Sequence, residues 1–122
     1  TSRDLLKIFV KAYKNTELKK IMEQSSYTFK ELLSKDKIKS HTIKNSNKLV
    51  AKPNSAYKIL SSKTGYIDEA GSNLIMLIES TKDKKQYVII TLGNPDYANR
   101  FVEPDKIAQW ISTQKLNLAS TK

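Results

Sequence analysis

The fold is decided by one stretch of sequence, Ile59-Leu60-Ser61-Ser62-Lys63-Thr64-Gly65-Tyr66-Ile67-Asp68-Glu69-Ala70-Gly71-Ser72-Asn73-Leu74. A β-prone run reaches Lys63-Thr64-Gly65, and Ala70-Gly71 then predicts a turn into a second strand. Apolar runs at residues 74–78 and 87–92 follow, on either side of a charged turn at residues 81–85. We therefore expect a mainly antiparallel sheet in which these three strands lie side by side in chain order.

Helices from both ends of the chain are expected to cover this sheet. Because residues 74–78 are apolar in succession, both faces of their strand should be buried, as in a central strand beneath helices. Thr1 or Ser2 caps a first helix, whose apolar positions are Leu5, Leu6, Ile8, Phe9, Ala12 and Tyr13. A short second helix follows, and its residues Leu18, Ile21 and Met22 are expected to face inward. Pro104 or Asp105 opens a last helix, which carries Ile107, Ala108, Trp110 and Ile111. The expected fold class is α/β, of the α+β kind, with helices flanking the sheet.

Between the first helices and the central stretch, the pattern predicts a hairpin that lies away from the chemistry. Residues 26–33 alternate as a strand, residues 34–37 form a turn, and residues 38–43 return as a second strand. The run Asn45-Ser46-Asn47 is expected to cap a turn or short helix that carries Leu49. We interpret this run as a device that positions the backbone.

The composition describes one lysine-rich globular unit, since 122 residues suffice for a single domain with a modest core. Lys and Arg number 22 against 12 Asp and Glu, which gives a net charge of +10, yet only Arg3 and Arg100 are arginines. We interpret this charge as a solvated basic surface, and the alternative is attraction to an anionic wall polymer, a membrane surface or nucleic acid. Nucleic-acid readers use more arginine interleaved with aromatic residues, so no nucleic-acid partner is expected.

Cysteine and histidine usage excludes several kinds of site. The chain has no cysteine, which excludes disulfides and Cys-ligated metals. His41, the only histidine, has no second histidine to share a metal, so we interpret it as structural or exposed. No metal or other cofactor is expected. No signal peptide or membrane-spanning run is present, and the start at Thr1 leads us to expect a fragment of a longer protein.

Lys63-Thr64-Gly65 brings a cation, a hydroxyl and a bare backbone together on one strand. Lysine supplies a point charge, threonine supplies a donor and an acceptor, and glycine lets another backbone approach. This combination suits the carboxylate and carbonyl of an extended, peptide-like substrate. The alternative is a hairpin whose glycine marks a turn and whose lysine is merely solvated.

The sequence around this triplet resembles the serine D-alanyl-D-alanine carboxypeptidases, which are low-molecular-mass penicillin-binding proteins. The resemblance covers nearly the whole chain, and the segments that carry it are Thr1-Ser2-Arg3-Asp4-Leu5, residues 41–49, Lys63-Thr64-Gly65-Tyr66 with Ala70-Gly71, residues 87–93, and Arg100 before the helix near Trp110. It implies that residues 1–122 form a single unit, the C-terminal part of a β-lactamase/transpeptidase-like domain.

The resemblance also implies a role for each matching residue. Lys63 would be catalytic, near the nucleophile, and would favour the substrate carboxylate or a proton relay. Thr64 would hydrogen-bond that carboxylate, Gly65 would let the substrate backbone dock, and Tyr66 would present backbone groups to the acyl carbonyl. Arg100 would help to hold the terminal carboxylate, because guanidinium forks suit carboxylates. The alternative for Arg100 is a surface cation at a strand end.

The implied activity is the removal of the terminal D-Ala from peptidoglycan stem peptides through an acyl-enzyme. The partners would be a stem peptide ending in D-Ala-D-Ala and β-lactams, and the location would be the extracytoplasmic cell envelope. A nucleophilic serine needs an adjacent base, which this family supplies through Ser-x-x-Lys and a second motif, Ser-x-Asn.

The chain departs from the family at both of these motifs. Its Ser-x-x-Lys strings begin at Ser34, Ser55 and Ser112, in a turn, before a strand and at a helix end, whereas the family's nucleophile begins a buried helix. No Ser-x-Asn is present. We therefore expect the nucleophile and its base to lie N-terminal to Thr1, so that this chain supplies half of a site and is inactive alone. Absent neighbouring strands would leave an exposed edge, which favours an edge-paired or swapped homodimer.

Two other functions remain open from the sequence. One is a non-catalytic cell-wall-binding relative that uses the basic surface. The other is a basic nucleic-acid-binding domain, which would lose its affinity steeply with salt.

Overall fold

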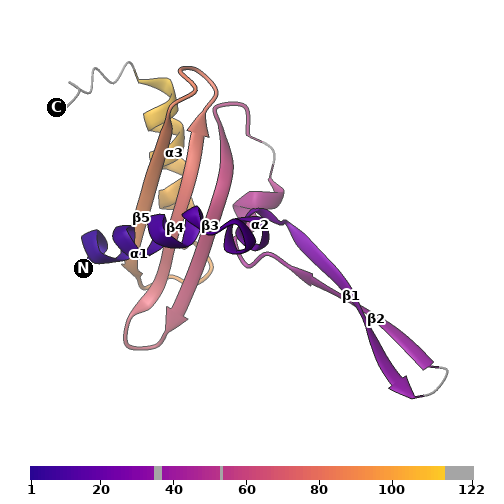
Figure 1. The fold of residues 1–122 in the computed structure, drawn as a ribbon. Coiled ribbons are helices and arrows are strands. Elements are labelled where there is room, and N and C mark those ends of the chain that lie inside the picture. The colour runs from indigo at the N-terminus through magenta and orange to yellow at the C-terminus, as the bar shows by residue number, and fades with distance from the viewer. Residues whose placement is uncertain (35–36, 53, 115–122) are drawn as a thin grey trace.

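The computed structural model describes residues 1–34, 37–52 and 54–114. Along the chain the elements are α1 (Ser2–Lys14), α2 (Thr16–Glu23), β1 (Ser26–Ser34), β2 (Lys37–Lys44), the 3-10 helix η1 (Lys48–Ala51), β3 (Tyr57–Ile67), β4 (Gly71–Ser80), β5 (Gln86–Asn94) and α3 (Val102–Thr113). Strands β1 and β2 form one antiparallel sheet, and β3, β4 and β5 form another (Figure 1). The predicted α+β class, with an antiparallel sheet and flanking helices, is confirmed.

The three-stranded sheet has the order β3-β4-β5, as predicted, with β4 in the centre. Its register pairs Lys63 with Ile75 and Thr64 with Leu74, and continues from Ile75 to Ile90 on β5. Residues that lie directly opposite in antiparallel strands share a face, and successive residues alternate between faces. The register therefore decides which helix each side chain of the sheet faces.

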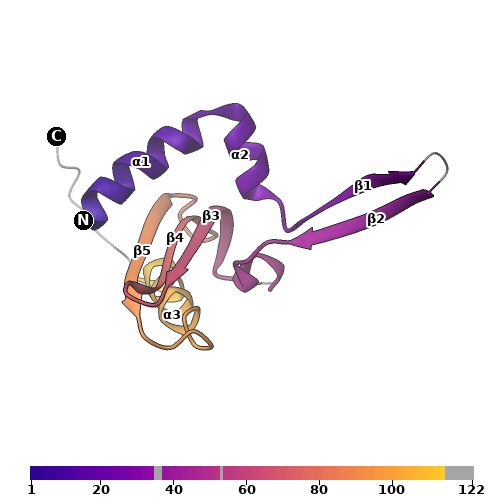
Figure 2. The same ribbon diagram turned by 90° about the horizontal axis from the view of Figure 1, so that it is seen from below.

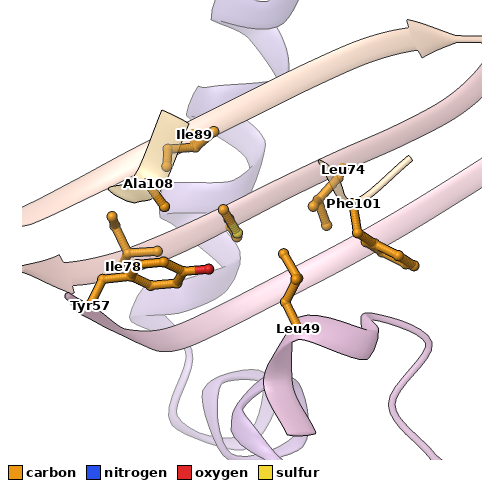
Figure 3. Packing of buried hydrophobic residues seen from close by; sticks show 8 residues of the cluster. Leu49, Tyr57, Leu74, Ile78, Ile89, Phe101 and Ala108 are labelled. Carbon is orange, nitrogen blue, oxygen red and sulfur yellow. The ribbon is translucent and has the colours of Figure 1, made fainter. Parts of the chain in front are cut away.

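Each face of the sheet has its own hydrophobic core, because the helices come from both ends of the chain (Figure 2). On one face, Phe9 of α1 packs with Ile75 and Leu77. On the other, which we call the α3 face, the buried cluster consists of Leu49, Tyr57, Leu74, Met76, Ile78, Ile89, Phe101 and Ala108 (Figure 3). The prediction that β4 would be buried on both sides is confirmed.

The prediction of which residues of the first two helices face the core is partly wrong. Thr1 caps α1 as predicted, and Phe9 is buried, but Ile8 is 66% exposed, and Leu6 also stays exposed. In α2, Leu18 and Ile21 are exposed, and only Met22 packs against the core. For α2 the reason is placement, because this helix contacts the edge strand β3 and only Met22 reaches the core on the α1 side of the sheet (Figure 2).

The last helix also begins earlier than predicted, at Val102, with Phe101 as its N-cap. Phe101 makes no side-chain cap, and it is instead buried against the sheet. Tertiary packing thus fixes this helix start where the sequence offers no capping side chain. No helix of the described residues is long and apolar enough to cross a membrane.

The predicted hairpin is formed by β1 and β2, and it projects from the rest of the molecule (Figures 1 and 2). All of β1 is exposed, and on β2 only His41 is partly covered. His41 Nε2 lies 2.7 Å from Glu31 Oε2, and its ring stacks on Phe29. A cross-strand hydroxyl pair, Thr28 Oγ1 to Thr42 Oγ1 at 2.8 Å, is also formed. His41 is therefore partly exposed and makes its contacts within the hairpin, in agreement with its interpretation as structural or exposed.

A polar contact fastens α3 to the start of β3. Tyr57 donates from its hydroxyl to Asp105 Oδ1 at 2.6 Å, and Gln109 Nε2 donates to the same oxygen at 3.0 Å. Lys52 Nζ lies 3.6 Å from Asp105 Oδ2. Burial acts to raise the pKa of Asp105, but these hydrogen bonds and the lysine outweigh it, so the pKa lies below its usual value. The folded state therefore favours ionised Asp105.

Asp105→Asn is expected to lower the free energy of unfolding by about 1–3 kcal/mol at pH 7, as for loss of a hydrogen-bonded charged group. Because the folded-state pKa is lowered, this contribution is present above the unfolded value of about 3.9 and is lost as pH falls through the folded value. Urea unfolding of both proteins between pH 7 and pH 2.5 checks this, with Glu103→Gln, exposed in the same helix turn, as the control. Equal stability of Asp105→Asn and the unchanged chain at pH 7 would contradict it.

Candidate functional site

The predicted site lies on β3, which is an edge strand of the described sheet. An edge strand presents unpaired backbone N–H and C=O groups along its free side. Thr64 pairs with Leu74, whose side chain belongs to the α3-face cluster, whereas Lys63 pairs with Ile75, which faces α1. The cation and the hydroxyl therefore lie on opposite faces of the strand and not side by side on one face, because strand side chains alternate.

The long side chain of Lys63 folds back onto the backbone of its own strand. Its ammonium donates a hydrogen bond to the backbone carbonyl of Thr64. The side chain remains exposed. A small pocket of about 140 Å³ borders Lys63 on the α1 side, and its other lining residues are Leu5, Thr64, Gly65, Asn73, Leu74 and Ile75. The positive charge therefore lies beside the backbone carbonyl of Thr64 on β3.

Thr64 is buried, with 9% of its surface exposed, and its hydroxyl meets a second hydroxyl. Ser46 Oγ lies 2.6 Å from Thr64 Oγ1, and either oxygen can be the donor. Ser46 itself is exposed. The two hydroxyls therefore form a pair at the border between the core and the surface.

The loop that carries Ser46 is held by its two asparagines. Asn45 Nδ2 donates to the carbonyl of Gln24 at 2.9 Å, and Asn45 Oδ1 accepts from the backbone N–H of Asn47 at 2.9 Å. Asn47 is 1% exposed, and its Oδ1 accepts from the backbone N–H of Leu49 at 3.0 Å, which caps η1. The predicted capping role of this run is confirmed, and it fixes the place of Ser46.

Gly65 and Gly71 have different reasons for lacking a side chain. A Cβ on Gly71 would lie 2.9 Å from the carbonyl oxygen of Asn94, and Gly71 has a φ of +63°. A Cβ on Gly65 would meet only the Cβ of Asn73, at 4.0 Å, which is an ordinary contact. The described chain therefore requires a glycine at position 71 but leaves open space at position 65, on the side of β3 that faces α1.

Arg100 is a buried cation without a carboxylate. Only 8% of its surface is exposed, and its guanidinium carbon lies 4.0 Å from the ring centre of Tyr97 and 4.8 Å from that of Phe101. Its Nε is buried without a hydrogen-bond partner, and within residues 1–34, 37–52 and 54–114 no acidic group forms an ion pair with it. The alternative of a surface cation at a strand end is therefore wrong. Burial of such a charge is unfavourable unless a partner completes it.

A series of side-chain turns leads the chain from β5 to Arg100. Asn94 Oδ1 accepts from the backbone N–H of Asp96 at 2.8 Å. Asp96 in turn accepts from the backbone N–H groups of Ala98 at 2.8 Å and Asn99 at 3.0 Å. The backbone N–H of Asn99, together with its side-chain amide, lowers the pKa of Asp96. These turns fix Tyr97 and Arg100 in place.

Tyr97 joins Arg100 to β3. Its ring meets that of Tyr66 edge-on, with centroids 5.1 Å apart, and it also contacts the guanidinium of Arg100. The Tyr66 hydroxyl donates to Asp68 at 2.8 Å, and this hydrogen bond raises the pKa of Tyr66. Since Tyr66 and Thr64 lie two residues apart on one strand, they share the α3 face. The structure therefore brings Thr64, Tyr66 and Arg100 to one face, with Ser46 and Tyr97 added.

Of the three Ser-x-x-Lys strings, only the one from Ser55 to Lys58 lies wholly within the described residues. Ser55 lies before β3, its carbonyl accepts from the Thr81 hydroxyl, and no hydrogen bond joins it to Lys58. Ser112 is buried near the end of α3 without a hydrogen-bond partner. The string from Ser34 includes residues 35–36, and Lys115 of the Ser112 string also lies outside the described residues.

A larger pocket, of about 470 Å³, lies between α2 and the base of the projecting hairpin. Its lining is mainly apolar, from Ile21, Tyr27 and Ile43, with Lys44 as its charged residue. It contains no acid–base pair or nucleophile arrangement. Size alone therefore does not make this pocket a better candidate than the edge of β3.

Comparison with protein-family models and with curated proteins found no match for this sequence. Function therefore has to follow from the chemistry of the site and from the resemblance in its motif. The candidate site in the structure includes Ser46 and Tyr97, which were not predicted as site residues from the sequence. Ser46 lies 18 positions from Thr64, and no local periodicity signals such a contact.

Proposed function

We propose that this chain carries the substrate-carboxylate half of a serine D-alanyl-D-alanine carboxypeptidase site. The observation that carries the proposal is the buried Arg100, which lacks an ion-pair partner in the described residues. Arg100 contacts Tyr97, which packs on Tyr66, and Tyr66 lies on the same face of β3 as Thr64. A free peptide carboxylate would complete both groups, because guanidinium and hydroxyl groups donate and a carboxylate only accepts.

The edge of β3 supports an extended substrate. An added strand can pair with the free backbone of an edge, and its side chains alternate on either side. Gly65 leaves open space on the side of this strand that faces α1, although the chain itself could hold a Cβ there. In the proposal, Lys63 places its charge near the reacting centre, and the backbone of Tyr66 faces the acyl carbonyl. These roles follow the resemblance of the Lys63-Thr64-Gly65 motif.

The proposed reaction transfers the penultimate D-Ala carbonyl of a peptidoglycan stem peptide to a serine hydroxyl, with release of the terminal D-Ala, and water then hydrolyses the ester. The serine and its base would come from a segment outside these 122 residues, at the cell envelope. β-Lactams would acylate the same serine. The chain alone would bind the carboxylate end of the substrate but would not form the acyl-enzyme.

Acylation by a fluorescent penicillin tests the proposal. This chain and the longest protein product of the same gene are incubated with the label and separated on a denaturing gel. We expect a labelled band from the longer protein alone, because a covalent label requires the nucleophile as well as the carboxylate site.

Two other results would contradict parts of the proposal. If neither protein is labelled, the carboxypeptidase function is wrong, and a non-catalytic wall-binding relative becomes the better interpretation. If the 122-residue chain is itself labelled, the division of the site is wrong, and mass spectrometry of the labelled peptide would identify Ser34, Ser55 or Ser112 as the nucleophile.

A further inference from the structure

We infer that Ser46 is a positioning residue that directs the Thr64 hydroxyl toward the substrate carboxylate, an inference that rests on the proposed function. Their oxygens are 2.6 Å apart, so a hydrogen bond joins them. Neither hydroxyl has another side-chain partner in the described residues. The orientation of each hydroxyl hydrogen therefore depends on the other and on whatever is bound.

A bound carboxylate fixes the direction of this pair. A hydroxyl has one hydrogen to donate, and a carboxylate can only accept. If Thr64 donates its hydrogen to the carboxylate, its oxygen is left to accept, and Ser46 must be the donor. The result is a chain of two hydrogen bonds, from Ser46 to Thr64 and from Thr64 to the carboxylate. Such chains polarise each member and strengthen the terminal bond.

Ser46 is suited to this task because its loop is fixed at both ends. Asn45 is bonded to the end of α2 through Gln24, and Asn47 caps η1, whose Leu49 belongs to the core. An exposed serine on a free loop would have to be ordered at each binding event, at an entropic cost. Here the loop is already ordered, so the Thr64 rotamer that meets the substrate can be set before binding.

The chain contains a matched control for this hydroxyl pair. Thr28 and Thr42 also place their hydroxyl oxygens 2.8 Å apart, on the projecting hairpin. Removal of a hydroxyl from that pair changes the same kind of contact outside the proposed site. Thr42→Val should therefore leave substrate kinetics unchanged, whereas Ser46→Ala should not.

The test measures penicillin acylation and D-Ala release from a peptide ending in D-Ala-D-Ala, with the longest product of the gene. We expect Ser46→Ala to raise KM about 3- to 10-fold and to slow acylation at low penicillin concentration by a similar factor, as for loss of one hydrogen bond. The value of kcat should stay within about 2-fold, since the contact acts on binding. Ser46→Thr, which keeps the hydroxyl, should restore KM. Urea unfolding should show little change for Ser46→Ala, because the residue is exposed.

A Thr64→Val background separates positioning from direct contact. If Ser46 acts through Thr64, then Ser46→Ala adds no further effect once the Thr64 hydroxyl is absent. A further rise in KM there would make Ser46 a direct ligand and overturn the inference. Normal kinetics for Ser46→Ala would overturn it while leaving the proposed function intact. Failure of the unchanged protein to take the label would instead remove the proposed function, and the inference with it.

Discussion

Gly65→Ala is expected to leave the fold intact and to lower penicillin acylation of the longest product of the gene about 100-fold, since small displacements of a bound substrate can cost that much. A Cβ at this position meets no close neighbour in the described chain, so its methyl group would project into open space on the side of β3 that faces α1, next to any backbone that docks along this strand. Because alanine restricts the unfolded chain more than glycine does, stability should be equal or higher by about 0.5–1 kcal/mol.

Gly71→Ala is the matched control, and the opposite outcome is expected. Its φ of +63° disfavours alanine, and the new Cβ would lie 2.9 Å from the backbone oxygen of Asn94. Strain and overpacking together should lower the free energy of unfolding by about 2–4 kcal/mol. Urea unfolding of the 122-residue chain and acylation of the longer protein measure both quantities. Undiminished acylation in Gly65→Ala would show that no backbone docks at this glycine.

Arg100→Met is expected to raise KM for a peptide ending in D-Ala-D-Ala by about 30-fold or more, because loss of one member of a buried charge pair costs about 2 kcal/mol or more. Methionine fills much of the same space but offers no donors. The fold should tolerate it, with a free energy of unfolding within about 1 kcal/mol of the original. Stacking of the guanidinium on the rings of Tyr97 and Phe101 stabilises the fold by about 0.5–2 kcal/mol. The loss of this stacking energy is offset, because the substitution also removes the buried Nε, which has no hydrogen-bond partner and therefore destabilises the fold.

Arg3→Met is the control, since Arg3 is the other arginine of the chain and lies exposed in the first turn of α1. Steady-state kinetics and urea unfolding of both variants separate binding from packing. A large loss of stability in Arg100→Met with KM unchanged would show that Arg100 is held for its aromatic contacts alone. Arg100→Lys is informative as well, because an ammonium keeps the charge but lacks the planar fork.

The sheet could be predicted from the sequence because its signals are local. The apolar run of β4 and the turns at its ends fix the strands, and short turns between successive strands leave little freedom in their order. The inward faces of the helices were harder to predict. Apolar spacing in α2 indicates an amphipathic helix, yet the exposure of Leu18 and Ile21 depends on where that helix lies against the sheet.

The site shows the same division between local and distant information. Lys63, Thr64 and Gly65 stand in one motif, so their presence on one strand could be predicted. The contact between Ser46 and Thr64 and the burial of Arg100 could not, because both depend on segments brought together only by the complete fold. The opposite orientation of Lys63 and Thr64 follows from strand alternation once the edge position of β3 is known.

The simple strand order of the sheet has a consequence for how the chain folds. Each pair of neighbouring strands in β3-β4-β5 is also consecutive along the chain and is joined by a short turn. Closing such short loops costs little entropy, and low contact order is associated with fast folding. The helices α1 and α3 come from opposite ends of the described chain, and each needs a formed sheet face on which to bury its apolar side chains. The sheet can therefore form as two successive hairpins, and its formation provides the surfaces on which both helices dock.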